Sequence, residues 1–284
     1  IRQADRLRTL NTEASDDQCT DIHEIAQLHA AQERMRLALD SFANYVPSDV
    51  VRELLDKGQA AVIGGRHTSM SILFTDIEGF TSISEKMPPD QLTAHMANYF
   101  DAMIHIITEH NGTVDKLIGD AIVAFWGAPK PNEHHARDAI QGALRCHEEL
   151  QKLNERWEAE GLPRLPTRFG VSTGEVMVGN VGAVNRLSYT ALGDAVNLAS
   201  RLEGANKFYG TRIIAAANSV RDAGDQFLWR KLDKVRVLGR SEPELIYELL
   251  GERGQVPELR LEHARLYEAA FDAYLARDFT GATD

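Results

Sequence analysis

Two kinds of hydrophobic pattern alternate along most of the chain. Helical spacing of apolar residues covers 89–110, 133–158 and 193–206. Between and after these helices, short apolar runs predict strands at 69–76, 113–117, 121–126, 167–173, 175–181, 186–190, 211–215, 228–237 and 243–249. Gly119-Asp120 predicts a tight hairpin between two of the strands. Helices interspersed with hairpins predict an α+β sandwich in which helices cover one face of a mainly antiparallel sheet.

The first 65 residues follow a different pattern. From Ile25 to Val46, apolar residues recur at alternating intervals of 3 and 4 and form a seam with one polar member, Gln32. An amphipathic helix packed on its own domain would give this pattern, but three heptads with one exception favour a coiled coil. Pro47 ends the predicted helix. We expect a helical segment over 1–65, a main domain over 66–250 and a C-terminal helical extension over 251–284.

Composition and charge narrow the functional classes. A formal net charge of -11 argues against broad electrostatic binding to nucleic acid. The two cysteines, Cys19 and Cys146, suggest no disulfide framework and favour a reducing compartment. No apolar run approaches the roughly 18 residues of a membrane span, yet the chain begins at Ile1 without a methionine. We therefore expect a cytoplasmic protein, or alternatively the cytoplasmic part of a membrane-anchored protein whose membrane segment precedes Ile1.

Two short motifs place carboxylates where predicted strands end. In ILFTDIEGFT (72–81), Asp76 ends an apolar strand, and in DKLIGDA (115–121), Asp120 lies in the hairpin turn. If the hairpin pairs beside the first strand, the two carboxylates converge. Each aspartate alone is typical of a turn or cap, but a pair at one sheet edge suits Mg²⁺, which binds one or two carboxylates together with phosphate oxygens. The amides of Gly79, Phe80 and Thr81 open a predicted helix and can bind phosphate.

Four motifs in this order and spacing, FTDIEGFT, DKLIGDA, TRFGVSTGEVMVGNVG and YTALGDAVNLASRLE, resemble those of the class III nucleotidyl cyclase catalytic domain. The resemblance covers residues 68–250. It implies a ferredoxin-like α/β sandwich with extra elements, and a homodimer whose catalytic domains pair head to tail so that each site takes residues from both. It also implies two metal ions per site, Mg²⁺ or Mn²⁺, held by Asp76, Asp120 and the backbone carbonyl of Ile77.

Two of these motifs supply candidate nucleotide-binding residues. Gly193-Asp194 opens a predicted helix on which Asn197 and Arg201 lie one turn apart, an arrangement that by itself is typical of a helix surface. The resemblance implies that Asn197 positions the ribose and that Arg201 stabilises charge at the α-phosphate in the transition state. Arg168 begins a predicted strand. Its position alone indicates a solvated strand-end charge, whereas the resemblance implies a contact with the triphosphate.

Lys116 and Thr190 are the candidates for purine recognition. By pattern alone, Lys116 is an exposed strand lysine. The resemblance implies that both residues contact the purine edge. Lysine offers only donors, which suits N1 of adenine, and a threonine hydroxyl can accept a hydrogen bond from the exocyclic amine. Guanylate cyclases typically have Glu and Cys at these positions, so the Lys/Thr pair indicates ATP, and threonine in place of the more familiar aspartate resembles the class IIIb subgroup.

One position departs from the family pattern. The family often has Val-Lys-Gly near its last strands, with a lysine that reaches the terminal phosphates. This chain has Val237-Leu238-Gly239, and Leu238 supplies no charge. Arg240 lies two residues further on and on the same strand face, so it is the candidate to replace the lysine.

The motifs together predict an adenylate cyclase that makes 3′,5′-cyclic AMP and pyrophosphate from ATP. A guanylate or mixed-specificity cyclase is the first alternative, which Lys116 and Thr190 disfavour. A catalytically silent nucleotide-binding regulatory domain is the second, which the presence of both aspartates and of the Asn/Arg pair disfavours. The N-terminal seam resembles the output helix of a HAMP linker followed by a short transducer, which implies an upstream sensor or membrane domain.

Overall fold

The computed structural model describes residues 23–43, 50–51, 62–183, 185–235 and 243–282. The chain divides into two units, and each is described by itself. The first is made of Ile1–Gly64 and Asn180–Tyr189, and the second of Gly65–Gly179 and Thr190–Asp284. None of the described helices is both long enough and apolar enough to span a bilayer.

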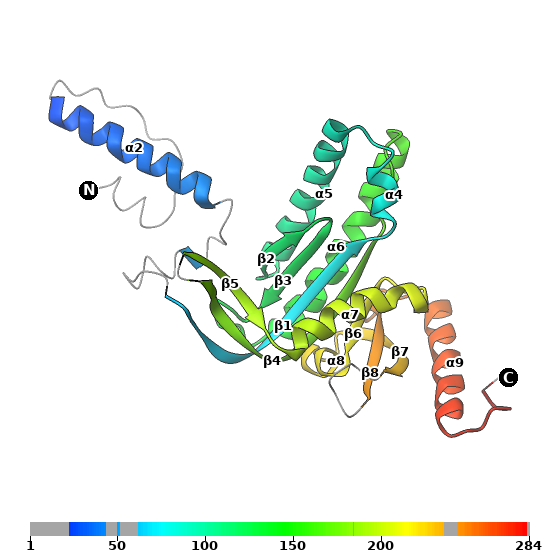
Figure 1. The fold of residues 1–284 in the computed structure, drawn as a ribbon. Coiled ribbons are helices and arrows are strands. Elements are labelled where there is room, and N and C mark those ends of the chain that lie inside the picture. Colours follow the sequence, from blue (N-terminus) through cyan, green and yellow to red (C-terminus); the bar gives the residue numbers. More distant parts are fainter. Residues whose placement is uncertain (1–22, 44–49, 52–61, 184, 236–242, 283–284) are drawn as a thin grey trace. The chain divides into compact units, whose positions relative to one another are not determined.

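The first unit contains the helix predicted from the apolar seam. α2 (His23–Ala43) covers most of the predicted range (Figure 1), and Ile25, Leu28 and Met35 are exposed on it. Val46 and Pro47 lie outside the described residues. An apolar row on the surface of a helix is the property that a coiled coil requires. The coiled coil itself stays a prediction.

The described strands form an eight-stranded sheet in the order β2-β3-β1-β4-β6-β8-β7, with β5 paired to β4. Antiparallel pairing joins β1 to β3, β2 to β3, β6 to β8 and β7 to β8, whereas β4 and β6 run parallel. The predicted α+β fold is confirmed, with a mixed sheet. The strands are β1 (Gly64–Ile77), β2 (Thr113–Ile118), β3 (Ala121–Trp126), β4 (Thr167–Ala183), β5 (Arg186–Leu192), β6 (Ile213–Ala216), β7 (Phe227–Val235) and β8 (Glu244–Glu252).

The two strands predicted at 167–173 and 175–181 form one continuous strand, β4. A Cβ at Gly174 would lie 3.3 Å from the Cβ of Ala195 in α7 (Asp194–Tyr209), so this glycine marks a close contact between helix and strand, not an interruption. The contact is tighter at Gly170, where an added Cβ would overlap the backbone of Ala199 and Glu203. α7 therefore packs directly against β4.

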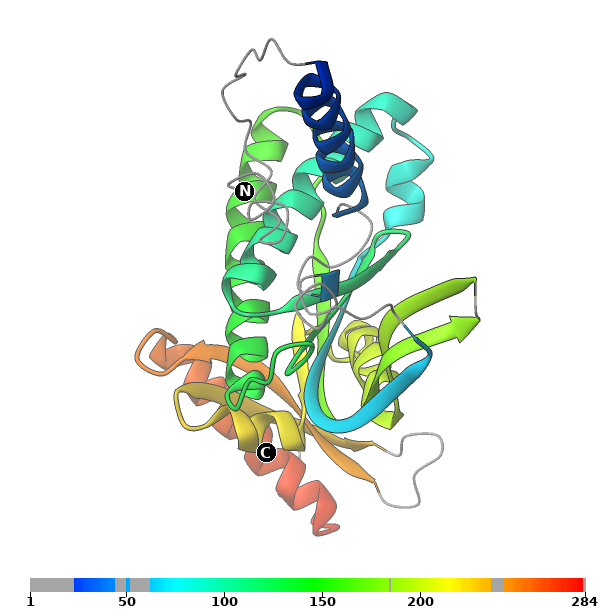
Figure 2. The ribbon, with the colours of Figure 1, turned by 90° about the vertical axis from the view of Figure 1, so that its left-hand side faces the viewer.

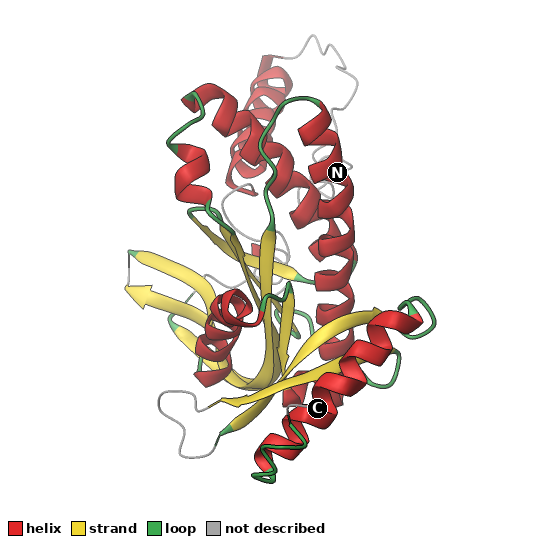
Figure 3. Ribbon diagram, turned by 90° about the vertical axis from the view of Figure 1, so that its right-hand side faces the viewer, coloured by secondary structure: helices red, strands yellow, loops and turns green. Residues whose placement is uncertain are grey.

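Helices pack against both faces of the sheet, whereas the sequence pattern predicted one covered face. Ile213 and Ala215 of β6 belong to the main core with α5 (Pro89–Glu109) and α6 (His135–Ala159), while Ile214 and Ala216 belong to a second cluster with α7. Figures 2 and 3 show helices on both sides of the sheet. All of β6 is buried, so its apolar run carries no alternation that would reveal two covered faces. The remaining helices are α4 (Phe80–Ser84), α5 (Pro89–Glu109), α6 (His135–Ala159), α8 (Ala217–Ala223), which was not predicted, and α9 (Glu258–Leu275).

α9 lies within the C-terminal helical extension predicted over 251–284, and it packs on the strand β7. The Tyr267 hydroxyl donates a hydrogen bond of 2.9 Å to the Leu232 carbonyl, and the Lys231 Nζ donates one of 2.9 Å to Asp272. The C-terminal helix is therefore attached to the second unit through specific contacts.

Candidate metal and nucleotide site

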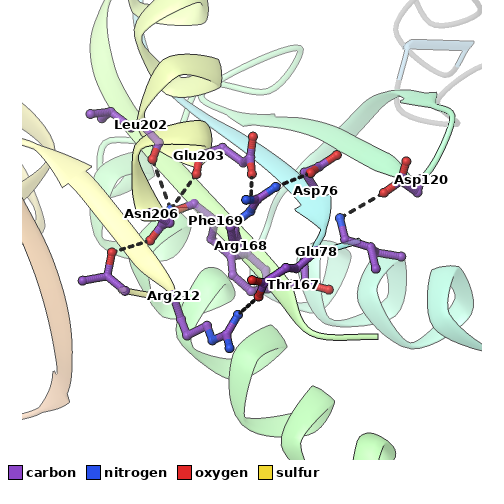
Figure 4. A network of polar contacts seen from close by, with 12 residues as sticks. Asp76, Glu78, Asp120, Thr167, Arg168, Phe169, Leu202, Glu203, Asn206 and Arg212 are labelled. Atoms are coloured by element: carbon purple, nitrogen blue, oxygen red, sulfur yellow. Dashed lines mark hydrogen bonds and ion pairs between the residues drawn. The ribbon is translucent and has the colours of Figure 1, made fainter. Parts of the chain in front are cut away.

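The two predicted metal-binding aspartates come together at one end of the sheet. β1 ends at Ile77, and its antiparallel pairing with β3 brings that end to the turn between β2 and β3. Gly119, with a φ of 63°, forms this turn, and Asp120 follows it. The Asp120 Oδ2 accepts a hydrogen bond of 3.0 Å from the backbone N–H of Ile77, the residue next to Asp76 (Figure 4). The convergence expected from the two motifs is present.

Electrostatics at this edge favour a bound cation. Burial raises the pKa of Asp120 and the neighbouring Asp76 carboxylate raises it further, while the Ile77 N–H and Arg168 oppose the rise. Within the described part of the chain, no group of three or more His, Cys, Asp or Glu side chains is arranged to hold a metal ion by itself. Two carboxylates are enough for a Mg²⁺ ion that completes its coordination with phosphate oxygens and water, so the residues present fit such an ion.

Arg168 lies at the same edge and is largely buried. It is the second residue of β4, its side chain is 13% exposed, and its Nη2 donates a hydrogen bond of 2.6 Å to Asp76 Oδ2 (Figure 4). Its Nε lies 3.0 Å from Glu203 Oε1 on α7, an ion pair without hydrogen-bond alignment. Arg168 is therefore not the solvated strand-end charge that its position alone indicated. Its planar guanidinium stays charged at any working pH beside the predicted metal site.

Glu203, which is not among the residues predicted from the motifs, also belongs to this network. Its side chain is 14% exposed, and burial, followed by the charge of Asp76, raises the pKa of Glu203 to about 7 against the opposing effect of Arg168. A signal was available in the motif LASRLE. Ala199 and Glu203 are four residues apart and share one helix face, which Gly170 allows to approach β4.

The two predicted purine-contacting residues also lie together. Thr190 on β5 is buried, and the Nζ of Lys116 on β2 donates a hydrogen bond of 3.2 Å to its Oγ1. The Lys116 side chain is 43% exposed, so its remaining N–H groups can reach a ligand. Asp115, which the sequence analysis did not single out, accepts a hydrogen bond of 2.7 Å from the same threonine hydroxyl.

α7 carries its two candidate residues on its outer face. Asn197 and Arg201 are exposed one turn apart, whereas Glu203 and Asn206 face β4, where Asn206 Nδ2 donates a hydrogen bond of 2.9 Å to the Phe169 carbonyl. The Asn/Arg pair therefore points away from β4, the strand that carries Arg168, and so away from the Asp76 carboxylate to which Arg168 is bound.

The remaining candidates are less well defined by the structure. α4 begins after Gly79, whose φ is 72°, but it has only 5 residues. Phe80 packs partly against the core, and Thr81 is exposed, with its carbonyl accepting a hydrogen bond of 2.9 Å from the Ser84 hydroxyl. Phosphate binding by the amides at the start of α4 stays a prediction. Leu238 and Arg240 lie outside the described residues.

Comparison with known proteins identifies the family. Residues 63–251 match the model of the adenylate and guanylate cyclase catalytic domain. The chain belongs to this family. Adenylate cyclase 1 of Rhizobium meliloti (strain 1021) is 40% identical over 251 residues, which are 87% of this chain and 37% of the relative. An adenylate cyclase of Anabaena cylindrica is 35% identical over 240 residues, 81% of this chain and 47% of the relative. This cyclase-family chain thus spans less than half the length of both curated relatives.

Solved cyclase structures share the fold. The adenylyl cyclase CyaB from P. aeruginosa is 31% identical, with a TM-score of 0.62 over 69% of this chain and 100% of that chain. A guanylyl cyclase is 32% identical, with a TM-score of 0.62 over 68% of this chain and 97% of that chain. Because an adenylyl and a guanylyl cyclase are equally similar, membership of the cyclase family does not decide the purine base. The side chains at the base-contacting positions have to carry that argument.

Proposed function

We propose that this cyclase domain is an adenylate cyclase that converts ATP to 3′,5′-cyclic AMP and pyrophosphate. The observation that carries the choice of base is the contact between Lys116 and Thr190, which puts an ammonium and a hydroxyl side by side. A lysine can only donate, so it complements the N1 acceptor of adenine and opposes the N1–H donor of guanine. The names of the relatives from Rhizobium meliloti and Anabaena cylindrica support the same choice, and the threonine supports the class IIIb subgroup.

Asp76, Asp120 and the backbone carbonyl of Ile77 are the groups that would hold two Mg²⁺ or Mn²⁺ ions. When bound, such ions lower the pKa of the attacking 3′-hydroxyl and neutralise charge on the phosphates. Arg168 lies 2.6 Å from Asp76, so its guanidinium is placed to bind phosphate oxygens beside the same carboxylate. The carboxylate pair can bind the cations, and the fixed arginine beside it can bind the phosphates of the nucleotide.

The other assigned side chains act on the substrate directly. Arg201 stabilises the charge that develops at the α-phosphate, and Asn197 orients the ribose. Arg240 is the candidate for the terminal phosphates. We assign no general base, because the proton of the attacking hydroxyl can pass to water or to substrate.

A head-to-tail homodimer with two shared sites completes this proposal. Leu117 and Ile118 on β2 and Leu192 on β5 are exposed, and they flank the purine-contacting pair in sequence. Exposed apolar side chains that gather beside polar binding groups are typical of protein interfaces. Because the Asn/Arg pair of α7 faces outward, a second chain can bring it to the carboxylate edge of its partner.

The proposed organisation places this catalytic domain over 66–250 in the cytoplasm, within a longer signalling protein. The family match over 63–251 and the exposed apolar seam of α2 support a catalytic domain preceded by a HAMP-like coiled coil and transducer over 1–65. The length of the relatives supports an upstream sensor or membrane domain. Residues 251–284 form the C-terminal extension.

Product formation by purified protein tests the proposal. We expect cyclic AMP from ATP in the presence of Mg²⁺ or Mn²⁺, no product after removal of metal with a chelator, and much slower turnover of GTP. Preferred use of GTP would reject the base assignment. Binding of ATP without any turnover under either metal would favour the catalytically silent alternative.

A further inference from the structure

The buried carboxylate of Asp115 has no role in the site described above. Its side chain is 6% exposed, and its Oδ2 accepts a hydrogen bond of 2.7 Å from Thr190 Oγ1. The Lys116 Nζ lies 3.4 Å from the same Oδ2 and donates a hydrogen bond of 3.2 Å to Thr190 Oγ1. Carboxylate, ammonium and hydroxyl thus form a closed triangle of polar contacts.

A β-bulge makes this triangle possible. Along the β2–β3 pair, Val114 opposes Ala124 and Lys116 opposes Val123, so Asp115 is an extra residue in β2. Consecutive side chains of a regular strand point to opposite faces. The bulge turns Asp115 and Lys116 so that both reach Thr190, and bulges that redirect a side chain are common next to active sites.

The triangle fixes the hydrogen-bond polarity of the threonine hydroxyl. An ionised carboxylate can only accept and an ammonium can only donate, whereas a hydroxyl has one proton and two lone pairs. Thr190 therefore gives its proton to Asp115 and uses one lone pair for Lys116, which leaves one lone pair for a ligand. Burial raises the pKa of Asp115, and the Thr190 hydroxyl and the Lys116 ammonium oppose that rise by stabilising the ionised form.

We propose that Asp115 is a positioning residue that selects adenine by fixing the Thr190 hydroxyl as a hydrogen-bond acceptor. This inference rests on the proposed function, in which Lys116 and Thr190 contact the purine edge. The free lone pair accepts from the 6-amino group of adenine and opposes the O6 acceptor of guanine. If Asp115 were uncharged and able to donate, the hydroxyl proton would be free to bind guanine O6.

Asp115→Asn tests this role with almost no change in size, because its amide can donate to the threonine oxygen. We expect the ratio of kcat/KM for ATP to that for GTP, at fixed Mn²⁺, to fall about tenfold, which corresponds to about 1.4 kcal/mol. Asp115→Glu keeps the carboxylate and is expected to retain more of the preference than Asp115→Asn. A purely structural role would lower both activities together and leave the ratio in place.

Thr190→Val serves as the matched control, because valine has the shape of threonine without the hydroxyl. Thr190→Val should lower the ATP/GTP ratio, and Asp115→Asn added to it should change the ratio no further, since Asp115 acts through the hydroxyl. Independent, additive effects in the double variant would overturn the inference. A shifted ratio in Thr190→Val with an unchanged ratio in Asp115→Asn would overturn it as well, while leaving the proposed base contacts intact.

Two further measurements keep the outcome decisive. If neither Thr190→Val nor Lys116→Ala moves the ratio, the base assignment within the proposed function fails, and the role of Asp115 fails with it. The wild-type protein should use purine riboside triphosphate, which lacks the 6-amino group, about tenfold less well than ATP, and equal use of the two would overturn the inference. If Asp115→Asn does not fold, Asp115→Ser replaces it, alone and combined with Thr190→Val. Asp115→Ser is then expected to lower the ATP/GTP ratio, and an unchanged ratio would overturn the proposed role of Asp115.

Discussion

Glu203→Gln should make the cyclase domain more stable than wild type at alkaline pH, although it removes an ion pair. Glu203 lies beside Arg168 with a side chain that is 14% exposed, and burial together with the charge of Asp76 raises its pKa from 4.5 to about 7. Between these two pH values the unfolded chain has lost the Glu203 proton while the folded chain keeps it. The unfolded state then binds fewer protons, so this group lowers the stability of the fold as pH rises.

The size of the effect follows from the two pKa values. The interval from 4.5 to about 7 corresponds to about 3 kcal/mol, at about 1.4 kcal/mol for each pKa unit. Near pH 4.5 the folded wild type carries a neutral Glu203, and glutamine resembles it closely, so the two proteins should differ little. Above pH 7 the wild type has to ionise the buried group and the variant does not. The free energy of unfolding should therefore be higher for the variant than for the wild type, by up to about 3 kcal/mol.

Urea unfolding of both proteins at pH 5 and pH 8, extrapolated linearly to water, measures this difference. Glu78→Gln is the matched control, because Glu78 pairs with Arg212 at 2.7 Å on the surface and this contact lowers the pKa of Glu78. Its contribution is lost only as pH falls below about 4.5, so the effect of Glu78→Gln on the free energy of unfolding should be small and nearly the same at pH 5 and pH 8. If the free energies of unfolding of Glu203→Gln and wild type differ by the same amount at pH 5 and pH 8, the reasoning is refuted.

The remaining predictions concern turnover. Asp76→Ala or Asp120→Ala should abolish cyclic AMP formation with circular dichroism and dimer content unchanged, and normal activity of either variant under Mg²⁺ or Mn²⁺ would reject the metal assignment. Mixing inactive Asp120→Ala with inactive Arg201→Ala should restore partial activity, because the mixed dimer keeps one intact site; no recovery under subunit-exchanging conditions would reject shared sites. Lys116→Glu with Thr190→Cys should shift use from ATP toward GTP by about 1–3 kcal/mol for each mismatched contact, measured as the ratio of initial rates.

The carboxylate edge was within reach of sequence reasoning because short-range signals specify it. The apolar run that ends at Asp76 and the Gly119-Asp120 turn are both local, and pairing of the hairpin with the neighbouring strand is the only long-range step required. The register between β1 and β3 supplies that step. Residue types and turn chemistry therefore predicted where the two aspartates meet.

Glu203 and Asp115 escaped prediction because tertiary geometry decides their environment. Glu203 would be an ordinary surface residue of α7 if Gly170 did not let that helix approach β4 closely. Asp115 precedes Lys116, and a regular strand would send the two side chains to opposite faces. The bulge that brings both to Thr190 appears only in the pairing of β2 with β3. The pattern of β6 likewise conceals that helices cover both of its faces.

The contacts of Asp115 should also affect the variant Lys116→Glu with Thr190→Cys, which is designed to shift use from ATP toward GTP. A glutamate introduced at position 116 would replace a cation that now lies 3.4 Å from a buried carboxylate. Two neighbouring carboxylates raise the pKa of each other, so one of them tends to hold a proton and the new side chain becomes a poorer acceptor for the N1–H of guanine. Lys116→Glu with Thr190→Cys should therefore gain less GTP activity than the same pair combined with Asp115→Asn, which removes the competing charge. If the two variants have the same GTP/ATP ratio, Asp115 does not influence the charge at position 116.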